Sequence, residues 1–558
     1  MISSSTWVPR GFASEFPEKY ELNDEEMERI NAMANLELND AKEDLKVAEE
    51  QEEAQGKSST SKLKDQLEID DDLKEYNLES YDDEVEENGE KITMFPGLSN
   101  TGAKFHNDEE EEDAYLTLPT ETDDQEEKQE NQIYPTDNLI LATRTEDDIS
   151  WLDIYIYDDG AGSPNGEEEE EDKLDQDVAN GLVRDPTLYV HHDIMLPAFP
   201  LCVEWVNYKP ASETDDNIGN FAAVGTFDPQ IELWNLDYVD KAFPDLILGE
   251  PNKNSFTATK SKKSKKSKGH ITTHHTDAIL SLSHNKIHRS VLASTSADKT
   301  IKLWDLNSTT VVKSFNQIHH NKTVSSSQWH PQESSILLTG GYDFNAAISD
   351  VRSDNSTKYY NVGNEEVENV KWKNQSEIFY VGTDQGNLYC FDIKSEKPIW
   401  TLKAHDSGIS SLDVNNFIGD LLVTSAMNDK VVKLWKCNDS KGPSMILSRD
   451  FGLGNVLTSS FANDIEVGGN LIVGGITGGL KMWDTFSNSS IRHSFKSDLN
   501  NLQLKAREEA KSQGRASRIA RKYQNDQQEI TMTVEAGGED SDEDEEIEQM
   551  EEEEDYDE

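Results

Sequence analysis

Short apolar runs, each closed by a tryptophan and a small or acidic residue, recur along the C-terminal part of the chain, and we expect them to be β-strands. The tryptophans that end successive runs, Trp234, Trp304, Trp435 and Trp483, are separated by 70, 131 and 48 residues. The long gap contains two degenerate copies of the run, Ile348–Asp350 and Cys390–Asp392. With Ser349 and Phe391 in the tryptophan position, the gap divides into spacings of 45, 42 and 44 residues.

A period in the low to mid forties, with strands that end in Trp-Asp, is typical of the WD-repeat β-propeller. Tyr157-Asp158 supplies one more strand ending, so the sequence predicts an all-β, seven-bladed propeller over residues 131–497. The seven predicted endings are Tyr157, Trp234, Trp304, Ser349, Phe391, Trp435 and Trp483. A propeller favours a binding role over catalysis, although a fold alone does not assign a function.

The repeat also carries histidine and aspartate. Because an indole N–H is only a donor, a buried tryptophan needs an acceptor, and in WD repeats a histidine, an aspartate and a serine or threonine complete the network. We expect complete sets at His275, Asp298 and Trp304 and at His405, Asp429 and Trp435. Partial sets are expected at Asp228 with Trp234, at Trp483, and at His320 with Asp343. The role predicted for all of these residues is structural.

Charge is distributed very unevenly along the 558 residues, whose net charge is −59. Residues 1–130 hold 40 acidic and 12 basic residues, and the last 24 residues hold 16 acidic residues and no basic one. Such segments bury too little apolar surface to offset the entropy of ordering. We therefore expect disordered acidic arms at 1–130, which includes a short helix, and at 531–558. They serve solubility alone or meet basic partners such as ribosomal proteins or histones.

Two inserts and one extension depart from the repeat: an acidic insert at 160–177, a lysine-rich insert at 251–269 and a basic, helical extension at 498–530. The lysine run is a nuclear localisation signal, a loop that contacts RNA phosphates, or a solvated linker, and the first is favoured. The extension suits phosphate contact along a helix. The candidate basic residues are Lys262, Lys263, Lys265, Lys266, Lys268, Lys505, Arg507, Lys511, Arg515, Arg518, Arg521 and Lys522.

Aromatic residues cluster in the otherwise polar N-terminal arm. The candidates are Trp7, Phe12, Phe16 and Phe95, and we interpret them as docking anchors for a partner more readily than as remnants. A strand near Tyr115–Leu118 could also complete the last blade, a question that the sequence leaves open.

Motifs for catalysis and metal binding are missing from the sequence. There is no P-loop and no G-x-S-x-G elbow, and the three cysteines are far apart. The tandem pair His191-His192 does not suit a metal, since adjacent residues on a strand point to opposite faces. We expect no enzyme activity, cofactor, metal or small-molecule substrate, and no membrane span, because no run of 18 apolar residues exists. Ser541, followed by three acidic residues, resembles an acidophilic kinase site, so we expect a phosphoprotein.

Several segments match one family closely. The chain resembles the periodic tryptophan protein 1 family over essentially its whole length, and it looks like a fungal member. The segments that carry the resemblance are Trp7–Phe12, Phe16–Tyr20, Gly181–Pro186, Tyr189–His192, Leu196–Leu201, Gly225–Trp234, Gly269–Asp277 and Asn455–Phe461.

The resemblance implies a factor of the nucleus and nucleolus that acts in ribosome biogenesis. Such a factor binds precursors of the large ribosomal subunit through pre-ribosomal RNA, ribosomal proteins and other assembly factors during rRNA processing. The alternative is a chromatin-associated propeller whose acidic arms bind histones. A propeller hydrolase is disfavoured by the missing nucleophile.

Overall fold

The computed structural model divides the chain into two units, Met1–Lys19 with Asn131–Glu558, and Tyr20–Glu130. In the second unit, β3 (Lys104–His106) pairs antiparallel with β4 (Tyr115–Thr117). The strand near Tyr115 therefore pairs with β3. The structure describes residues 1–20, 104–106, 115–117, 128, 131–147, 149–159, 186–211, 217–249, 270–353, 356–374, 377–438, 442–512, 517–520, 522–523 and 530–534.

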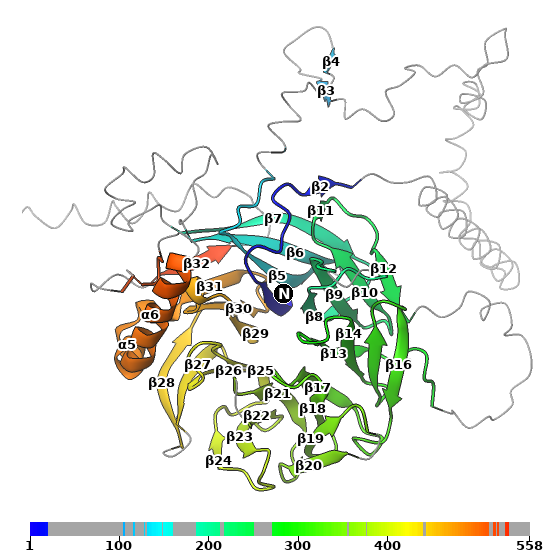
Figure 1. The fold of residues 1–558 in the computed structure, drawn as a ribbon, viewed down its shortest axis with the longest axis vertical. Coiled ribbons are helices and arrows are strands. Elements are labelled where there is room, and N and C mark those ends of the chain that lie inside the picture. The colour runs from blue at the N-terminus through cyan, green and yellow to red at the C-terminus, as the bar shows by residue number, and fades with distance from the viewer. Residues whose placement is uncertain are drawn as a thin grey trace, which may run out of the picture. The chain divides into compact units, whose positions relative to one another are not determined.

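The first unit is a ring of seven four-stranded antiparallel sheets, so the predicted fold class is confirmed (Figure 1). Blades 3 to 6 each use four consecutive strands, ordered from the centre of the ring outward. Their strands are β13 (Ile279–His284), β14 (Val291–Ser296), β15 (Ile301–Asp305), β16 (Thr310–Phe315), β17 (Val324–Trp329), β18 (Ile336–Gly341), β19 (Asn345–Asp350), β20 (Thr357–Asn361), β21 (Val367–Trp372), β22 (Ile378–Thr383), β23 (Asn387–Asp392), β24 (Trp400–Lys403), β25 (Ile409–Val414), β26 (Leu421–Ala426), β27 (Val431–Asn438) and β28 (Gly442–Asp450).

The core lies between neighbouring blades. The second strand of a blade is covered on both faces, which is why β9 (Phe221–Thr226) and β26 are buried along their whole length. One cluster joins Leu233 of blade 2 to Trp304 of blade 3. Because each blade needs its neighbours to bury its apolar faces, the ring must be closed to be stable.

Blade 2 has the shortest outer strand of the ring's described blades. It consists of β8 (Pro200–Val206), β9 (Phe221–Thr226), β10 (Ile231–Asn235) and β12 (Leu246–Leu248), with β12 outermost. Between β10 and β12, the two-residue β11 (Tyr238–Val239) pairs in parallel with β2 (Glu18–Lys19). This pairing ties the first residues of the chain to the outside of blade 2.

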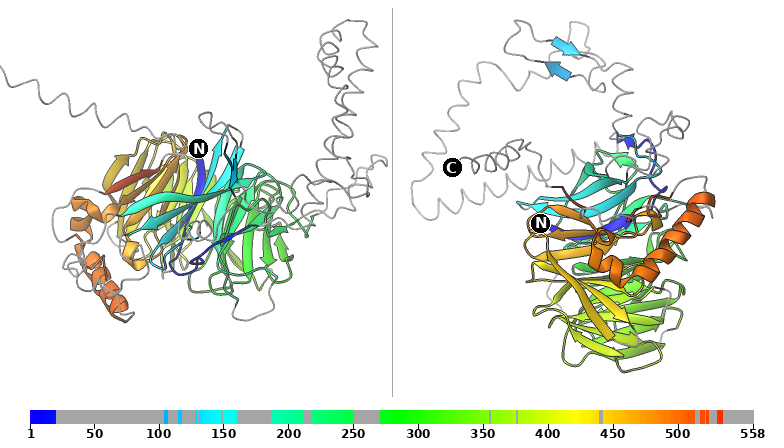
Figure 2. Two further views of the ribbon diagram at one scale, coloured as in Figure 1. Left: turned by 90° about the horizontal axis from the view of Figure 1, so that it is seen from above. Right: turned by 90° about the vertical axis from the view of Figure 1, so that its left-hand side faces the viewer.

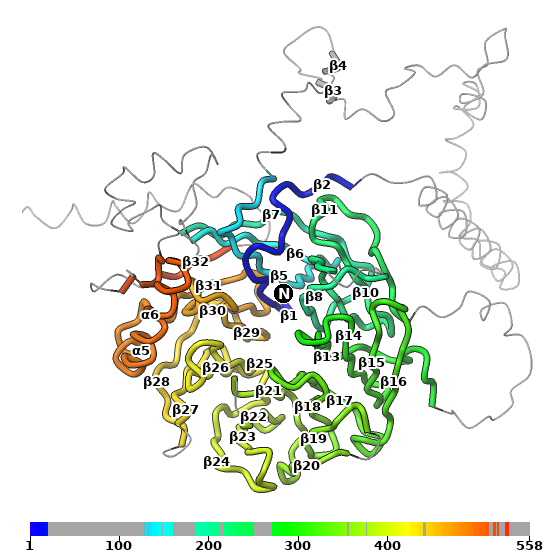
Figure 3. Tube along the Cα trace, in the orientation of Figure 1, coloured from blue at the N-terminus to red at the C-terminus, as the bar shows by residue number. Residues whose placement is uncertain are grey.

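Blade 1 takes its innermost strand from the start of the chain. Its order is β1 (Ile2–Val8), β5 (Asn138–Glu146), β6 (Ile149–Asp158) and β7 (Thr187–Leu196). In Figure 3, β1 lies at the centre of the ring, where it contacts β29 (Val456–Phe461) of blade 7 and β8 of blade 2. The predicted start of the propeller at residue 131 is therefore wrong, because residues 2–8 are part of the ring.

Blade 7 takes its outermost strand from the other end. Its order is β29 (Val456–Phe461), β30 (Asn470–Gly475), β31 (Leu480–Asp484) and β32 (Thr531–Val534). The predicted start of the acidic tail at 531 is therefore wrong, because residues 531–534 form β32 of the propeller. Between β31 and β32 come η6 (Thr485–Ser487), α5 (Ser489–Ser494) and α6 (Lys496–Ser512), and Figure 2 shows both α-helices on the outside of the ring. The short η5 (Ile465–Val467) lies between β29 and β30.

The antiparallel order places the connections on two faces. The upper face carries the turns between the second and third strands of each blade and the connections from one blade to the next. The lower face carries the connections between the first and second strands and between the third and fourth strands. The long segments 9–137, 159–186 and 485–530 all connect strands at the lower face of blades 1 and 7. The inserts 160–177 and 251–269, the short helix predicted in the arm, and the tail beyond 534 lie outside the described residues. No helix in the described ranges is long and apolar enough to cross a membrane.

Candidate functional site

Blade 3 contains the full predicted network. His275 Nδ1 lies 2.9 Å from Asp298 Oδ2, and His275 Nε2 lies 2.7 Å from Ser294 Oγ. Trp304 Nε1 donates to the same Ser294 Oγ at 2.8 Å. Burial alone would raise the pKa of Asp298, but hydrogen bonds from His275 and Thr300 outweigh it and hold that pKa well below its usual range. Burial lowers the pKa of His275, against the raising effect of Asp298. The His275 ring connects the turn that carries Asp298 to Ser294 on β14.

Blade 6 repeats this arrangement. His405 Nδ1 lies 2.9 Å from Asp429 Oδ2, and His405 Nε2 lies 2.9 Å from Thr424 Oγ1. Trp435 Nε1 donates to Thr424 Oγ1 at 2.8 Å. The structure thus brings together both sets of three residues chosen from the sequence.

In blade 4 the histidine chosen from the sequence is the wrong one of a pair. His319 is the buried histidine, with Nδ1 at 2.7 Å from Asp343 Oδ1 and Nε2 at 2.8 Å from Thr339 Oγ1. The side chain of His320 is 64% exposed and contacts the other oxygen of Asp343 at 3.0 Å. His320 has a φ of 48°, so the chain turns there and sends the two rings in different directions.

In blade 2 a glutamate accepts the hydrogen bond from the tryptophan. Trp234 Nε1 donates to Glu232 Oε2 at 3.2 Å, and both side chains are buried. Asp228 is exposed and its backbone N–H donates to Thr226 Oγ1, so its predicted place in the network is wrong. Burial raises the pKa of Glu232 to about 7, against the lowering effect of the Trp234 hydrogen bond.

The degenerate blades depend on packing. Trp483 is 1% exposed, and its Nε1 has no hydrogen-bond partner among the described residues. Its ring packs against Phe451, and Arg449 lies 4.9 Å above it. In blade 5, Phe391 stacks on Phe379 with ring centroids 5.5 Å apart.

A second series of tryptophans, on the innermost strands, was missed in the sequence. Trp329 and Trp372 are each the sixth residue of their strand, and their indole N–H groups donate to the carbonyls of Ser283 and Gln328 on the preceding inner strand. Trp7 is also sixth in β1 and donates to the Ser460 carbonyl at 3.1 Å. The 43-residue spacing between Trp329 and Trp372 could have revealed this second series in the sequence.

This position changes the interpretation of the N-terminal aromatic residues. Trp7 is 1% exposed, so it is a core residue and cannot anchor a partner. Phe12 packs edge-on against Trp205 at 4.9 Å. Phe16 is 47% exposed and remains a docking candidate, whereas Phe95 lies outside the described residues.

The basic extension is split into an exposed helix and a bound segment. Lys505, Arg507 and Lys511 lie on the exposed side of α6, whose Leu499, Leu502 and Ala506 pack on the propeller. The helix ends at Ser512, and a separate segment follows.

That segment binds the lower face. Lys522 Nζ lies 2.7 Å from Asp484 Oδ2, and the Tyr523 hydroxyl donates to the same oxygen at 2.7 Å. The backbone N–H of Arg518 donates to Glu466 at 2.9 Å. The prediction of a helical extension over 498–530 is therefore wrong in its extent, because α6 ends at Ser512 and Arg518 and Lys522 contact the propeller. Arg515, Arg521 and the lysine run, Lys262, Lys263, Lys265, Lys266 and Lys268, lie outside the described residues.

The start of the chain is bound nearby. Arg10 Nη2 lies 2.7 Å from Asp159 Oδ2, and the Arg10 backbone N–H donates to Asp464 at 3.0 Å. Arg10 Nε also donates to Asn138 at 2.7 Å. These contacts join the beginnings of the long lower-face segments to blades 1 and 7.

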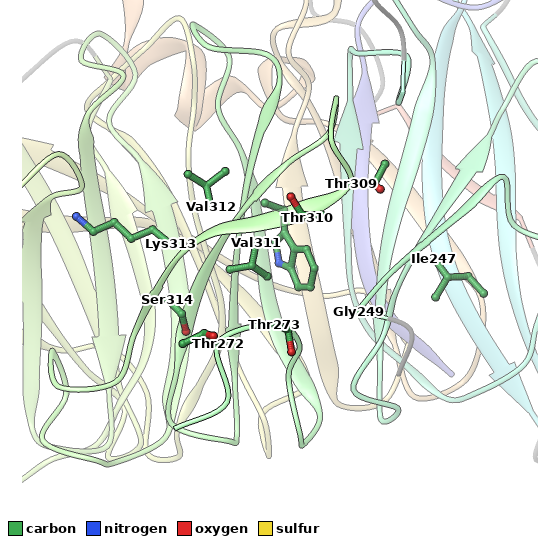
Figure 4. Close-up of a pocket in the computed structure, with 11 residues that line it drawn as sticks. Ile247, Gly249, Thr272, Thr273, Thr309, Thr310, Val311, Val312, Lys313 and Ser314 are labelled. Carbon is green, nitrogen blue, oxygen red and sulfur yellow. The ribbon is translucent and has the colours of Figure 1, made fainter. Parts of the chain in front are cut away.

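A pocket of about 530 Å³ lies between blades 2 and 3 (Figure 4). Its walls carry hydroxyl and aliphatic groups, such as Thr272, Ser314 and Val311, together with the edge of Trp304. Lys313 is the only charged residue among the described residues of this lining, which contain no carboxylate, imidazole or thiol.

The tandem histidines do not behave as expected from an ordinary strand. His191 Nδ1 and His192 Nδ1 lie 2.7 Å apart, because a bulge in β7 at His191 brings both rings to one side. The expectation of opposite faces was wrong there. In the described ranges, no group of three or more histidine, cysteine or acidic side chains is arranged to hold a metal ion.

Comparison with known proteins agrees with this architecture. The WD domain, G-beta repeat model matches residues 266–305 and 396–436. The chain is 59% identical to periodic tryptophan protein 1 of Saccharomyces cerevisiae, over 97% of this chain and 98% of that protein. It is 38% identical to an uncharacterized WD repeat-containing protein of Schizosaccharomyces pombe, over 89% and 91%. It is 30% identical to the periodic tryptophan protein 1 homolog of Drosophila melanogaster, over 82% and 88%. The chain therefore belongs to the periodic tryptophan protein 1 family.

Proposed function

We propose that this protein is a non-enzymatic scaffold of ribosome biogenesis that binds precursors of the large ribosomal subunit in the nucleolus. The observation that carries the proposal is membership of the periodic tryptophan protein 1 family, shown by 59% identity over 97% of the chain. The nucleolar role is what the resemblance to that family implies. The seven-bladed ring supports a scaffold, since propellers present extended surfaces on a rigid frame.

The charged segments suit such a particle, in which RNA and basic proteins lie side by side. Lys505, Arg507 and Lys511 are exposed on α6, where Glu508 and Glu509 are exposed as well, and we expect the three basic side chains to contact rRNA phosphates. The lysine run at 260–268 serves nuclear import, and the acidic arms meet basic ribosomal proteins or assembly factors.

Ultraviolet crosslinking in cells, followed by sequencing of the bound RNA, tests this function. The proposal expects crosslinks to precursor rRNA of the large subunit. Replacing Lys505, Arg507 and Lys511 by glutamine should reduce these crosslinks, while replacing Lys394, Lys397 and Lys403 of blade 5 serves as the matched control. Recovery of histones and genomic DNA with no rRNA would favour the chromatin alternative and would reject the proposal.

A further inference from the structure

Exposed apolar side chains occur in turns and connections of several blades on the upper face of the ring. Six large hydrophobic residues in or next to its turns and connections are 37–60% exposed. They are Ile149, Phe227, Ile271, Phe344, Met427 and Ile476. Two of them, Phe344 and Met427, lie in the upper turns of blades 4 and 6, on either side of blade 5.

Three carboxylates lie among them, between blades 4 and 5. Glu366 precedes β21, Glu368 is on β21, and Asp384 is in the upper turn of blade 5. The Glu366 backbone N–H donates to Asp384 Oδ1 at 3.0 Å, and the Tyr342 hydroxyl lies 3.3 Å from both oxygens of Glu368. The first bond places the Asp384 carboxylate beside the backbone of Glu366, and Asp384 and Glu366 both lie close enough to Glu368 to repel its charge.

The carboxylates have no basic partner in the part of the chain that the structure describes. The described ion pairs include none in which a lysine or arginine meets Glu366, Glu368 or Asp384. Burial is the main cause that raises the pKa of Glu368 to about 7. Repulsion by Asp384 and Glu366 also raises this pKa, and the hydrogen bond from Tyr342 lowers it. A cation brought to this place would relieve a repulsion that is present in the free protein.

The acidic and apolar groups form one continuous strip. Phe344 lies in the same turn as Tyr342, at the blade 4 end. At the other end, the Met427 backbone N–H donates to the Gly408 carbonyl, which places the Met427 turn beside the connection that carries the exposed Asp406. The strip therefore runs over blades 4, 5 and 6 from Phe344 to Met427.

We propose that this strip binds a lysine- or arginine-rich segment of a protein partner. Basic side chains of the segment meet Glu366, Glu368 and Asp384, and its apolar side chains pack on Phe344 and Met427. RNA is disfavoured as the occupant because its phosphates would face the three carboxylates. A second copy of the chain is disfavoured by the net charge of −59. The inference goes beyond the proposed function, since it names a protein surface and does not require a ribosomal partner.

A charge-neutralising variant tests the strip in the full-length protein. The probe is a short fluorescein-labelled peptide of lysine, arginine and leucine, and the readout is fluorescence anisotropy. The triple variant Glu366→Gln, Glu368→Gln and Asp384→Asn should bind the peptide about tenfold more weakly. The control variant Glu333→Gln, Glu377→Gln and Glu396→Gln removes the same charge from the lower face and should change affinity less than about twofold. Equal weakening in both variants would mean attraction by net charge alone and would overturn the proposal.

A photocrosslinking amino acid locates the bound peptide. Placed at Phe344 it should crosslink the peptide, whereas at Ile287, exposed on the lower face, it should not. Crosslinking of single-stranded poly(U) at Phe344 in place of the peptide would overturn the proposal in favour of RNA. Self-crosslinking between two chains would overturn it in favour of a dimer. Unchanged thermal melting of each variant shows that the fold is kept.

Discussion

Trp7 Nε1 donates a hydrogen bond to the carbonyl oxygen of Ser460, and this bond joins two residues that are 453 positions apart in the sequence. Trp7 is 1% exposed, and its ring meets Tyr157 edge-on with centroids 6.5 Å apart. The bond repeats the one that Trp329 and Trp372 make between successive inner strands. The first strand of the chain thus closes the ring between blades 7 and 1.

Trp7→Ala should lower the free energy of unfolding by about 3–5 kcal/mol, because it removes a large buried side chain at the ring closure. Chemical denaturation followed by circular dichroism measures this change. Phe16→Ala, at a position that is 47% exposed, is the control and should change stability by no more than about 0.5 kcal/mol. A Trp7 variant as stable as the parent would show that β1 does not hold the ring closed.

Trp435→Phe and Trp483→Phe should differ in cost although both remove an indole from a buried strand end. Trp435 Nε1 donates to Thr424 Oγ1, whereas Trp483 Nε1 has no partner among the described residues. We expect the Trp435 variant to lose about 1 kcal/mol more than the Trp483 variant, which is the value of one net hydrogen bond. Equal losses measured by denaturant unfolding would argue against the network as a source of stability.

Glu232→Gln should stabilise the protein more at high pH than at low pH. Burial raises the pKa of Glu232 to about 7, from 4.5 for an ordinary glutamate. Between these values the folded state keeps a proton that the unfolded state releases, so the glutamate lowers stability as pH rises and its full cost is reached above about pH 7.

The amide retains an oxygen for Trp234 Nε1 and carries no charge. The advantage of the variant should therefore grow between about pH 5 and 7 and reach roughly 1–3 kcal/mol. Unfolding curves at several pH values measure it, with the exposed Glu396→Gln as the control for loss of one charge. An advantage that does not change with pH would contradict the assignment of a raised pKa.

Asp484→Ala should release the segment that contains Arg518 and Lys522 from the lower face. Asp484 is 1% exposed and receives bonds from Lys522 Nζ and the Tyr523 hydroxyl. Trypsin should then cleave after Arg518 and Lys522 faster than in the parent protein, as followed by mass spectrometry. Cleavage after Lys505 of α6 provides the internal reference, and an unchanged ratio of the two rates would contradict the docking of the segment.

Replacement of the six lysines of residues 260–268 by glutamine should reduce nuclear accumulation of a fluorescent fusion. The motivation is the cluster of lysine in an otherwise acidic chain. The matched control replaces the same number of lysines exposed on the propeller. Unchanged localisation of the first variant would reject the import signal.

The repeat was predictable from sequence because strand endings carry large side chains at a regular spacing. Even Ser349 and Phe391 could be placed, since the period held across them. Ring closure was not predictable in this way. The strand of Trp7 is rich in serine because it lines the centre of the ring, and more than a hundred residues separate it from β5. The alternation Thr531-Met-Thr-Val was the signal for the last strand, and the adjacent acidic tail concealed it.

Neighbouring side chains limited the prediction of the site. His319 and His320 are equivalent in sequence, and only the turn at His320 decides which ring is buried. Likewise, the basic residues of the extension form one cluster in the sequence. Arg518 and Lys522 bind carboxylates on the propeller, whereas no ion pair of Lys505 or Lys511 is found within the described residues. Contacts between residues far apart in the sequence decided these roles, and the spacing of residues along the chain cannot predict such contacts.

The most direct test of the scaffold function is sedimentation of the tagged protein in a sucrose gradient, with and without prior RNase treatment. The account predicts that the protein sediments with particles that contain precursor rRNA of the large ribosomal subunit, and that RNase moves it to lighter fractions. Sedimentation with nucleosomes, or as free protein before RNase treatment, would contradict it.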